Sequence, residues 1–219
     1  MSQRLRLLDL GSVDPLESQA VYHGLAEAVG EAEDPALILV RPESPYVCVG
    51  AHQELDKEVD LPYCKAAGLP VYRRQVGGGA VLLDADQLFF QFVIPNRHLA
   101  GGPVAELFPR MIAPVVDAYR SLGVEAEFRP VNDIHVAGRK IGGTGAAAIG
   151  EATVVVGSFM YRFDRETMAK ALRVSSEKFR DKLRAALSDY VASMDELLTD
   201  LPEPERLRDA FATAIQERL

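Results

Sequence analysis

The chain has 219 residues, 48% hydrophobic and 26% charged, which is the composition of an ordinary globular protein. Its 24 Lys and Arg against 32 Asp and Glu give a net charge of −8, which disfavours nucleic acid as the main partner. Two cysteines are too few for a disulfide framework, and no apolar run suffices for a signal peptide or a membrane span. We therefore expect a single domain, residues 1–219, that is cytoplasmic and has no membrane partner.

The apolar pattern predicts a sheet with helices packed on it. Short apolar, β-branched runs between turn residues predict strands at residues 5–10, 36–40, 46–49, 69–74, 80–83, 87–94, 124–128, 133–136 and 153–161. Helical spacing predicts helices at about 15–29, 61–67 and 104–122, with a charged helical part over about 165–219. Few helices separate the strands, which favours an α/β (α+β) fold with a mixed, largely antiparallel central sheet.

Three local signals refine these elements. Asp14 followed by Pro15 is typical of a helix N-terminus. The strands at 80–83 and 87–94 are expected to pair through the Asp84–Asp86 turn. Pro109 and Pro114 predict a kink or a late start in the helix that contains them.

The first candidate for chemistry is a triple glycine after a strand. Arg73 and Arg74 precede Gly77–Gly79, and glycines allow backbone N–H groups to approach an anion closely. Arginine adds bidentate donors for phosphate or carboxylate. The alternative is a flexible turn with two exposed arginines.

A second cation pair, Arg139-Lys140, lies beside another glycine cluster that ends at Gly145. The alternative interpretation is a hairpin turn at Ala137-Gly138 with an exposed lysine on the next strand. Residues 143–148 also match a dinucleotide-binding fingerprint, but only AAAIGEA separates it from the next strand, so the required helix is missing. Asn132-Asp133 before a strand predicts either a Mg²⁺ ligand or an Asx turn.

These motifs occur in the order of one known family. They are Gly50 with Gln53, RRQVGGGAVLLD at 73–84, Asn132-Asp133, RKIGGT at 139–144, and Gly157-Ser158. The region from Leu37 to Leu187 resembles the lipoate–protein ligase A family, within the biotin/lipoyl protein ligase and octanoyltransferase superfamily. The resemblance implies the catalytic-domain fold of that superfamily, which is similar to class II aminoacyl-tRNA synthetases.

The resemblance also implies a two-step reaction that uses ATP and Mg²⁺. The carboxylate of lipoate or octanoate is activated to acyl-AMP, and a lysine of an acceptor lipoyl domain then displaces AMP. Lys140 matches the family's catalytic lysine, which would stabilise developing charge, and Asp133 matches the metal ligand. The residues implied to bind the acyl group and adenylate are Arg73, Arg74, Gly77, Gly78, Gly79, Ala80, Asn132, Gly142, Gly143, Thr144, Gly157 and Ser158.

The chain departs from the family pattern at three positions. Val76 replaces a Ser or Thr, Leu83 replaces a His, and Val156 stands where a His is usual. Octanoyltransferases of this fold are the main alternative, because they use a cysteine nucleophile and an acyl carrier protein without ATP. This chain has no cysteine after Cys64, which favours the ligase. A non-catalytic lipoyl-domain binding module is the third alternative.

The implied partners are lipoyl-domain acceptors. They include the acyltransferase subunit of a 2-oxoacid dehydrogenase, the glycine-cleavage H protein or a dedicated lipoate-binding protein. Because many relatives add an accessory C-terminal domain that is not expected here, a separate small accessory subunit is a further expected partner. Residues 165–184 hold seven basic and three acidic side chains, so this helical segment is a candidate docking face or simply a solvated surface.

Overall fold

The computed structural model describes residues 4–30, 33–99 and 104–218. Within them, seven strands form a large mixed sheet, and three form a small one. In spatial order the large sheet contains β1 (Arg6–Val13), β2 (Ala36–Pro42), β6 (Gln87–Pro95), β10 (Ala152–Met160), β9 (Arg139–Ile149), β8 (Asp133–Val136) and β7 (Glu127–Arg129). Only β1 and β2 run parallel; the other neighbours are antiparallel. The predicted mixed, largely antiparallel sheet is confirmed.

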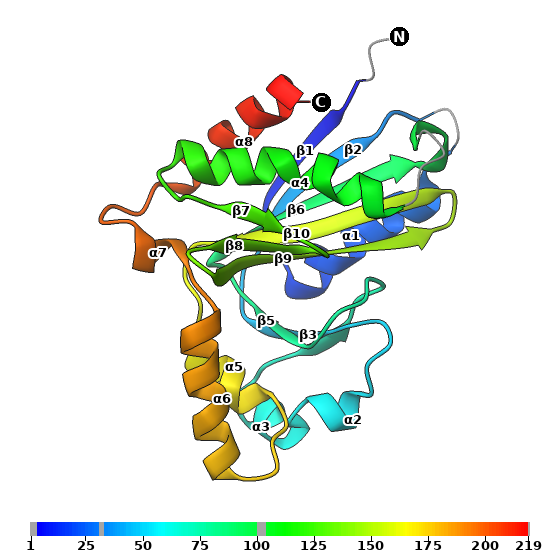
Figure 1. Cartoon of the computed structure of the whole chain (residues 1–219). Coiled ribbons are helices and arrows are strands. Elements are labelled where there is room, and N and C mark those ends of the chain that lie inside the picture. Colours follow the sequence, from blue (N-terminus) through cyan, green and yellow to red (C-terminus); the bar gives the residue numbers. More distant parts are fainter. Residues whose placement is uncertain (1–3, 31–32, 100–103, 219) are drawn as a thin grey trace.

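Helices cover both faces of the large sheet (Figure 1). Helices α4 (Val104–Ser121) and α8 (Pro204–Arg218) lie on one face, and α1 (Pro15–Ala28) lies on the other. Alternate residues of β6 serve the two layers, since Phe90 and Phe92 pack in the cluster under α4 and α8 while Phe89 packs with α1. This explains why all nine residues of β6 are buried.

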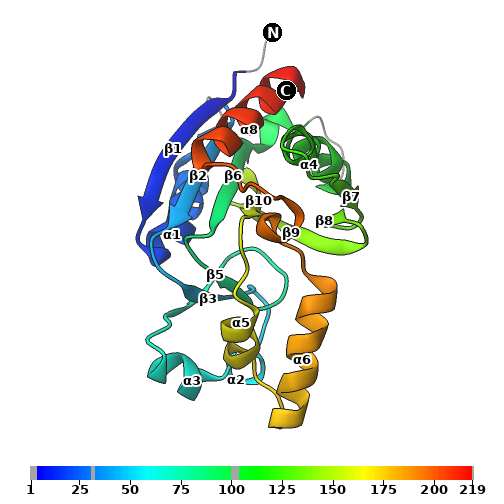
Figure 2. The same cartoon turned by 90° about the vertical axis from the view of Figure 1, so that its left-hand side faces the viewer.

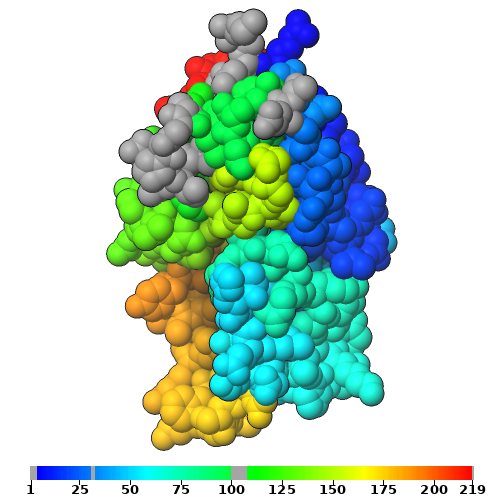
Figure 3. Space-filling view, turned by 90° about the vertical axis from the view of Figure 1, so that its right-hand side faces the viewer, coloured from blue at the N-terminus to red at the C-terminus, as the bar shows by residue number. Residues whose placement is uncertain are grey.

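The small sheet forms a separate lower layer with its own apolar cluster (Figure 2). Its strands are β4 (Val71–Arg73), β3 (Tyr46–Val49) and β5 (Val81–Leu83). Helices α2 (Leu55–Glu58), α3 (Leu61–Ala66), α5 (Arg165–Ala171) and α6 (Glu177–Tyr190) surround it, and α7 (Met194–Leu197) follows. The space-filling view shows the segment from β3 to β5, in cyan, beside the orange α6 (Figure 3). The chain therefore places two sheets one above the other.

The expected strand pair at 80–83 and 87–94 is wrong. Both strands exist, but β5 pairs with β3 in the small sheet, while β6 is paired on both edges by β2 and β10. Because both edges of β6 are occupied, no edge remains for β5. The Asp84–Asp86 turn instead carries the chain from one sheet to the other, and Arg41 donates to the carbonyl of Ala85 there.

Two other local expectations have different outcomes. Asp14 is the N-cap of α1, and its carboxylate accepts a hydrogen bond from the N–H of Leu16 at 2.8 Å, as predicted. Helix α4 runs from Val104 to Ser121 with Pro109 and Pro114 inside it, so the late start is not observed. Among the described residues, no helix combines the length and apolar character that a membrane crossing needs.

Candidate active site

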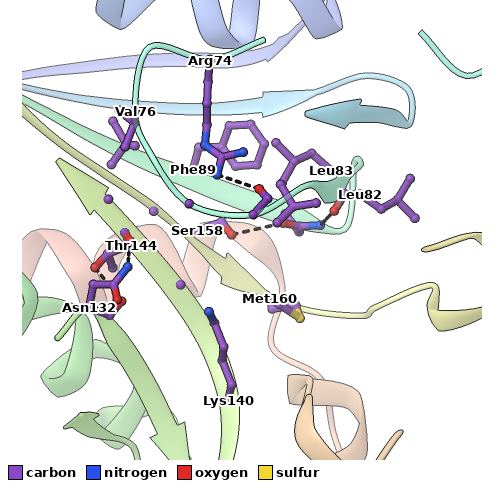
Figure 4. A pocket seen from close by; sticks show the side chains of 18 of the residues that line it. Arg74, Val76, Leu82, Leu83, Phe89, Asn132, Lys140, Thr144, Ser158 and Met160 are labelled. Carbon is purple, nitrogen blue, oxygen red and sulfur yellow. Dashed lines mark hydrogen bonds between the residues drawn. The ribbon is translucent and has the colours of Figure 1, made fainter. Parts of the chain in front are cut away.

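A cavity of about 290 Å³ lies between the two sheets. Its floor consists of β6, β9 and β10 of the large sheet, and the 74–79 loop and β5 cover it. Gln19 and Tyr22 of α1 line one part of the cavity, and Phe163, Met168 and Leu187 near α5 and α6 line another. Figure 4 shows Arg74 and Val76 of the covering loop on one side of this space and Lys140 on the other. The arrangement encloses a mostly apolar volume with one lysine in it.

The triple glycine forms the loop that covers the cavity. Arg74 does not extend freely into this space, because its guanidinium donates to the carbonyls of Cys48, Gly77 and Gly79 at 3.1, 2.9 and 2.8 Å. Gly78 has a φ of 103°, a conformation that other residues adopt only with strain. Arg74 therefore fixes the shape of the loop, and both Arg74 and the loop glycines line the cavity.

Arg73 binds the segment that follows β3. Its Nη1 donates to the carbonyls of Gly50, Ala51 and Gln53 at 2.9, 3.1 and 2.8 Å. Arg73 is not among the residues that line the cavity. The two arginines thus bind backbone carbonyls, whereas the sequence suggested that both face a ligand.

Lys140 is presented by a hairpin. Ala137 and Gly138 have φ values of 48° and 81° and form the turn between β8 and β9, as the alternative interpretation of this segment stated. Lys140 Nζ lies 2.7 Å from Asp133 Oδ1 across the hairpin, with the lysine side chain 41% exposed. A Cβ on Gly143 would lie 2.9 Å from Nζ, so the glycine leaves room for the ammonium group. The lysine is therefore held at the cavity by one carboxylate and remains accessible.

Asn132 and Thr144 join β8 to β9 beside the lysine. The Thr144 hydroxyl donates to the carbonyl of Asn132 at 2.8 Å, and the Asn132 amide donates to the carbonyl of Thr144. Both residues line the cavity (Figure 4). Their polar atoms therefore hold the two strands together at the wall of the site.

Asp133 lies beside the cavity, outside the residues that line it, and offers a single carboxylate to a metal ion. Oδ1 is paired with Lys140, and Oδ2 lies 3.8 Å from Nε2 of His135. The described residues contain no group of three or more His, Cys, Asp or Glu that could hold a metal. Mg²⁺ needs only one or two protein carboxylates when substrate phosphates complete its shell, so the residues fit a metal that arrives with a nucleotide.

Some of the remaining predicted site residues lie in the floor of the cavity, and others lie outside its lining. Gly143, Gly157 and Ser158 lie in the floor, where the Ser158 hydroxyl donates to Gln87 Oε1 at 3.1 Å. Gly157 has no room for a side chain, because a Cβ there would lie 2.4 Å from the ring of Phe90. Ala80 and Gly142 lie outside the lining, and Ala80 packs on the apolar cluster of the small sheet.

Sequence reasoning missed the α1 end of the cavity. Gln19, Tyr22 and Gln91 line it, and the Gln91 amide donates to the carbonyl of Ser18 at 2.7 Å. A signal was present in β6, where Gln87 and Gln91 are four residues apart, and so on the same face, in a strand that is otherwise wholly apolar. Buried glutamines on one face of a strand indicate a polar or ligand-facing wall.

Neither cysteine faces this space. Cys48 and Cys64 are both free and buried, and no cysteine is among the described residues that line the cavity. Burial raises the pKa of both thiols. The cavity therefore holds a lysine but no thiol nucleophile in the part of the chain that is described.

Comparison with known sequences identifies the family. The sequence profile of the lipoyl protein ligase A/B catalytic domain matches residues 14–216. The chain belongs to this family. A lipoate–protein ligase of Bacillus subtilis is 32% identical over 171 residues, which are 78% of this chain and 50% of that protein. The chain thus spans about half the length of that relative.

Other lipoyl ligase family members cover the chain more fully. An octanoyltransferase of Kyrpidia tusciae is 27% identical over 242 residues, covering 99% of this chain and 88% of that protein. A structure from Thermoplasma acidophilum, described as a bi-partite lipoate protein ligase and its E2 lipoyl domain, superposes with a TM-score of 0.88 at 26% identity, covering 99% and 84%. An ATP-bound lipoate–protein ligase A superposes with a TM-score of 0.80 at 25% identity, covering 100% and 85%. The predicted fold is confirmed.

Proposed function

We propose that the chain is an ATP-dependent lipoate–protein ligase that activates lipoate or octanoate to acyl-AMP and transfers the acyl group to a lysine of a lipoyl domain. In the first step a carboxylate oxygen of the acid bonds to the α-phosphorus of ATP, and pyrophosphate leaves. In the second step the amine of the acceptor lysine bonds to the acyl carbon, AMP leaves, and the amine loses a proton. Neither step needs a covalent enzyme intermediate.

The observation that carries the proposal is the pairing of an accessible lysine with a cavity that has no described thiol. Lys140 is the cation that lies at the cavity floor with its Nζ 2.7 Å from Asp133. An ammonium group aimed at developing negative charge lowers the barrier of both steps, which is worth about 10²–10³ in rate for a single donor. Asn132, Thr144 and the loop glycines would position the reacting groups, since orientation supplies much of such catalysis.

ATP is supported as a substrate by the ATP-bound relative of the same fold. Asp133 is our candidate Mg²⁺ ligand, through the oxygen that does not contact Lys140. When bound with the nucleotide, the ion would neutralise phosphate charge. The residues of this chain that would face the adenylate are the loop glycines Gly77–Gly79 and the floor glycine Gly143.

A lipoyl domain is the proposed acceptor, and a separate accessory chain is a proposed partner. Both proposals have support from the Thermoplasma relative, which is described as bi-partite and with its E2 lipoyl domain. The proposed acceptor is the acyltransferase subunit of a 2-oxoacid dehydrogenase, a glycine-cleavage H protein or a dedicated lipoate-binding protein.

An octanoyltransferase is the second candidate. It is favoured by the Kyrpidia relative, which covers nearly the whole chain. Its chemistry in this family would need a thiol near the lysine, and the sequence offers only Cys48 and Cys64, which are both buried. This contrast makes the two candidates separable by experiment.

The test is pyrophosphate exchange into ATP with the purified chain. We expect exchange that depends on lipoate or octanoate and falls sharply in Lys140→Ala. Acyl transfer from octanoyl carrier protein to a lipoyl domain without ATP would instead support the transferase. Binding of a lipoyl domain without either activity would favour a non-catalytic module. Adding a purified accessory chain to each assay tests whether a second subunit is required.

A further inference from the structure

Helix α6 presents an outer ridge to solvent. None of its 14 residues is buried. Residues three and four apart on a helix lie on one side, and here they place two large aromatic rings at the ends of an exposed stripe. The members of this outer ridge are Phe179, Lys182, Ala186 and Tyr190. Phe179 and Tyr190 are 54% and 72% exposed, and their separation of 11 residues corresponds to about 16 Å along the helix.

Two exposed lysines lie on or beside the outer ridge in a protein that is acidic overall. Lys182 Nζ lies 5.5 Å from the centre of the Phe179 ring, and Lys178 is also exposed. Helix α6 has four basic and three acidic side chains, whereas the whole chain has a net charge of −8. Two of the four cations, Arg180 and Arg184, are paired with carboxylates, which leaves Lys178 and Lys182 as the exposed positive charges of this helix. Exposed aromatic rings beside positive charge are typical of a surface that binds an acidic protein partner.

The helix ends at the candidate active site. Leu187 and Val191 line the cavity, and Val191 pairs with Lys140 as an isolated parallel bridge. The N–H of Ala192 donates to the carbonyl of Lys140 at 2.8 Å. Tyr190 precedes Val191, which lines the cavity, so a protein on the outer ridge would lie close to the cavity that its lysine must enter.

The other end of α6 is anchored as well. Arg180 Nη1 donates to the carbonyls of Ala169 and Lys170 at 2.8 and 3.0 Å, and Nη2 lies 3.4 Å from Asp60 Oδ2. Figure 2 shows α6 at the outer edge of the lower layer, with α5 between it and the small sheet. The ridge is thus held in a fixed relation to Lys140 by contacts at both of its ends.

We propose that the outer ridge of α6 is the docking surface for the acyl-acceptor domain, an acidic domain that presents its own lysine. This inference rests on the proposed function, because it names where the acceptor binds. The acceptor is the occupant that the geometry favours, since its lysine has to reach the acyl carbon beside Lys140. An accessory chain or a second copy of this chain would not need to lie close to Lys140.

The test is the double variant Phe179→Ser/Tyr190→Ser, with Leu7→Ser/Leu10→Ser on β1 as the matched control. Leu7 and Leu10 are 51% and 40% exposed and lie on the edge strand of the large sheet. Acyl transfer to the apo lipoyl domain of a 2-oxoacid dehydrogenase is measured together with pyrophosphate exchange. We expect a rise in KM for the lipoyl domain of at least tenfold and unchanged exchange in the α6 variant. The β1 control should change neither.

The charge contribution is tested with Lys178→Glu/Lys182→Glu. This variant should slow association with the lipoyl domain and weaken the salt dependence of the association rate. An unchanged KM for the lipoyl domain in both α6 variants would overturn the proposal. Two other results would also overturn the proposal. If the aromatic variant converts a dimer to a monomer, the ridge binds a second copy of this chain. If the variant no longer binds a purified accessory chain while the KM for the lipoyl domain is unchanged, the ridge binds that accessory chain.

Failure of the proposed function would look different. If the wild-type chain shows no acid-dependent exchange, calorimetric titration with the same unmodified lipoyl domain still measures docking. Binding that the α6 double variant weakens would keep the docking surface and discard the ligase. Binding that the variant leaves intact would discard the docking surface.

Discussion

The two glycine clusters look alike in the sequence but differ in the structure. Each has three glycines next to a pair of cationic residues. The first is a loop in which Arg74 donates hydrogen bonds to the carbonyls of Gly77 and Gly79 and, outside the loop, to the carbonyl of Cys48. The second is part of β9, a regular strand, and its Lys140 side chain lies at the cavity with a carboxylate as its partner.

The glycines serve different purposes in the two clusters. In the loop, Gly78 has positive φ, while Gly77 and Gly79 have open space where a Cβ would be. In the strand, Gly145 has no such space, because a Cβ would lie 2.3 Å from Cγ1 of Val76. The first cluster thus needs glycine for its backbone conformation. The second needs glycine because Val76 of the loop and the Lys140 side chain lie too close to the strand for a Cβ. A cation beside glycines is therefore an ambiguous signal until its hydrogen-bond partners are known.

The largest expected effect is on Lys140. In Lys140→Ala, acid-dependent pyrophosphate exchange should fall by about 10²–10³, because the cation that offsets developing charge is lost. The free energy of unfolding should change by no more than about 1 kcal/mol, since the ion pair with Asp133 is partly exposed. A comparable loss of exchange in Arg73→Ala, with stability intact, would contradict the distinction between the two cation pairs.

The strand glycine provides the next test. Gly145→Ala should lower the free energy of unfolding by about 1–3 kcal/mol through overpacking against Val76. Adding Val76→Ala should recover much of that loss, because it removes the clashing methyl groups. Urea unfolding of the single and double variants measures the coupling. The matched control is Gly79→Ala in the loop, where the open space predicts a change within about 0.5 kcal/mol.

Arg74→Lys tests the role of the loop cation. Lysine keeps the charge but cannot reproduce three hydrogen bonds to the carbonyls of Cys48, Gly77 and Gly79. We expect a loss of about 1–3 kcal/mol in unfolding free energy and a higher KM for ATP or the acid, because the loop loses its shape. Full stability and full activity would mean that only the charge of this residue matters.

Much of the fold follows from local patterns, but the pairing of its strands does not. The Asp14 cap and the strand at 133–136 are visible in the sequence because their causes lie within a few residues. The partner of β5 depends on which edges of β6 are already occupied, and that is set by β2 and β10, which are distant in sequence.

In the candidate site, too, local features could be predicted from the sequence and long-range contacts could not. The predicted Lys140 lies at the cavity, with Asp133 next to it, since both belong to one hairpin. The role of Arg74 could not be predicted, because one of its acceptors, the carbonyl of Cys48, is 26 residues away in the chain. The α1 wall, with Gln19 and Tyr22, is equally remote from the motifs that identify the site.

The smallest expected effect concerns Asp84, where the strand after the glycine loop ends. Burial raises the pKa of its carboxyl from 3.8 to about 6. The folded chain therefore binds this proton more tightly than the unfolded chain, so the group contributes stability fully below pH 3.8 and loses it as the pH rises through about 6. Asp84→Asn keeps an oxygen that can accept the hydrogen bond from the N–H of Asp86 but cannot ionise. Urea midpoints of both proteins across this pH range should diverge with rising pH, with the variant the more stable at pH 7; parallel curves would contradict the buried carboxyl.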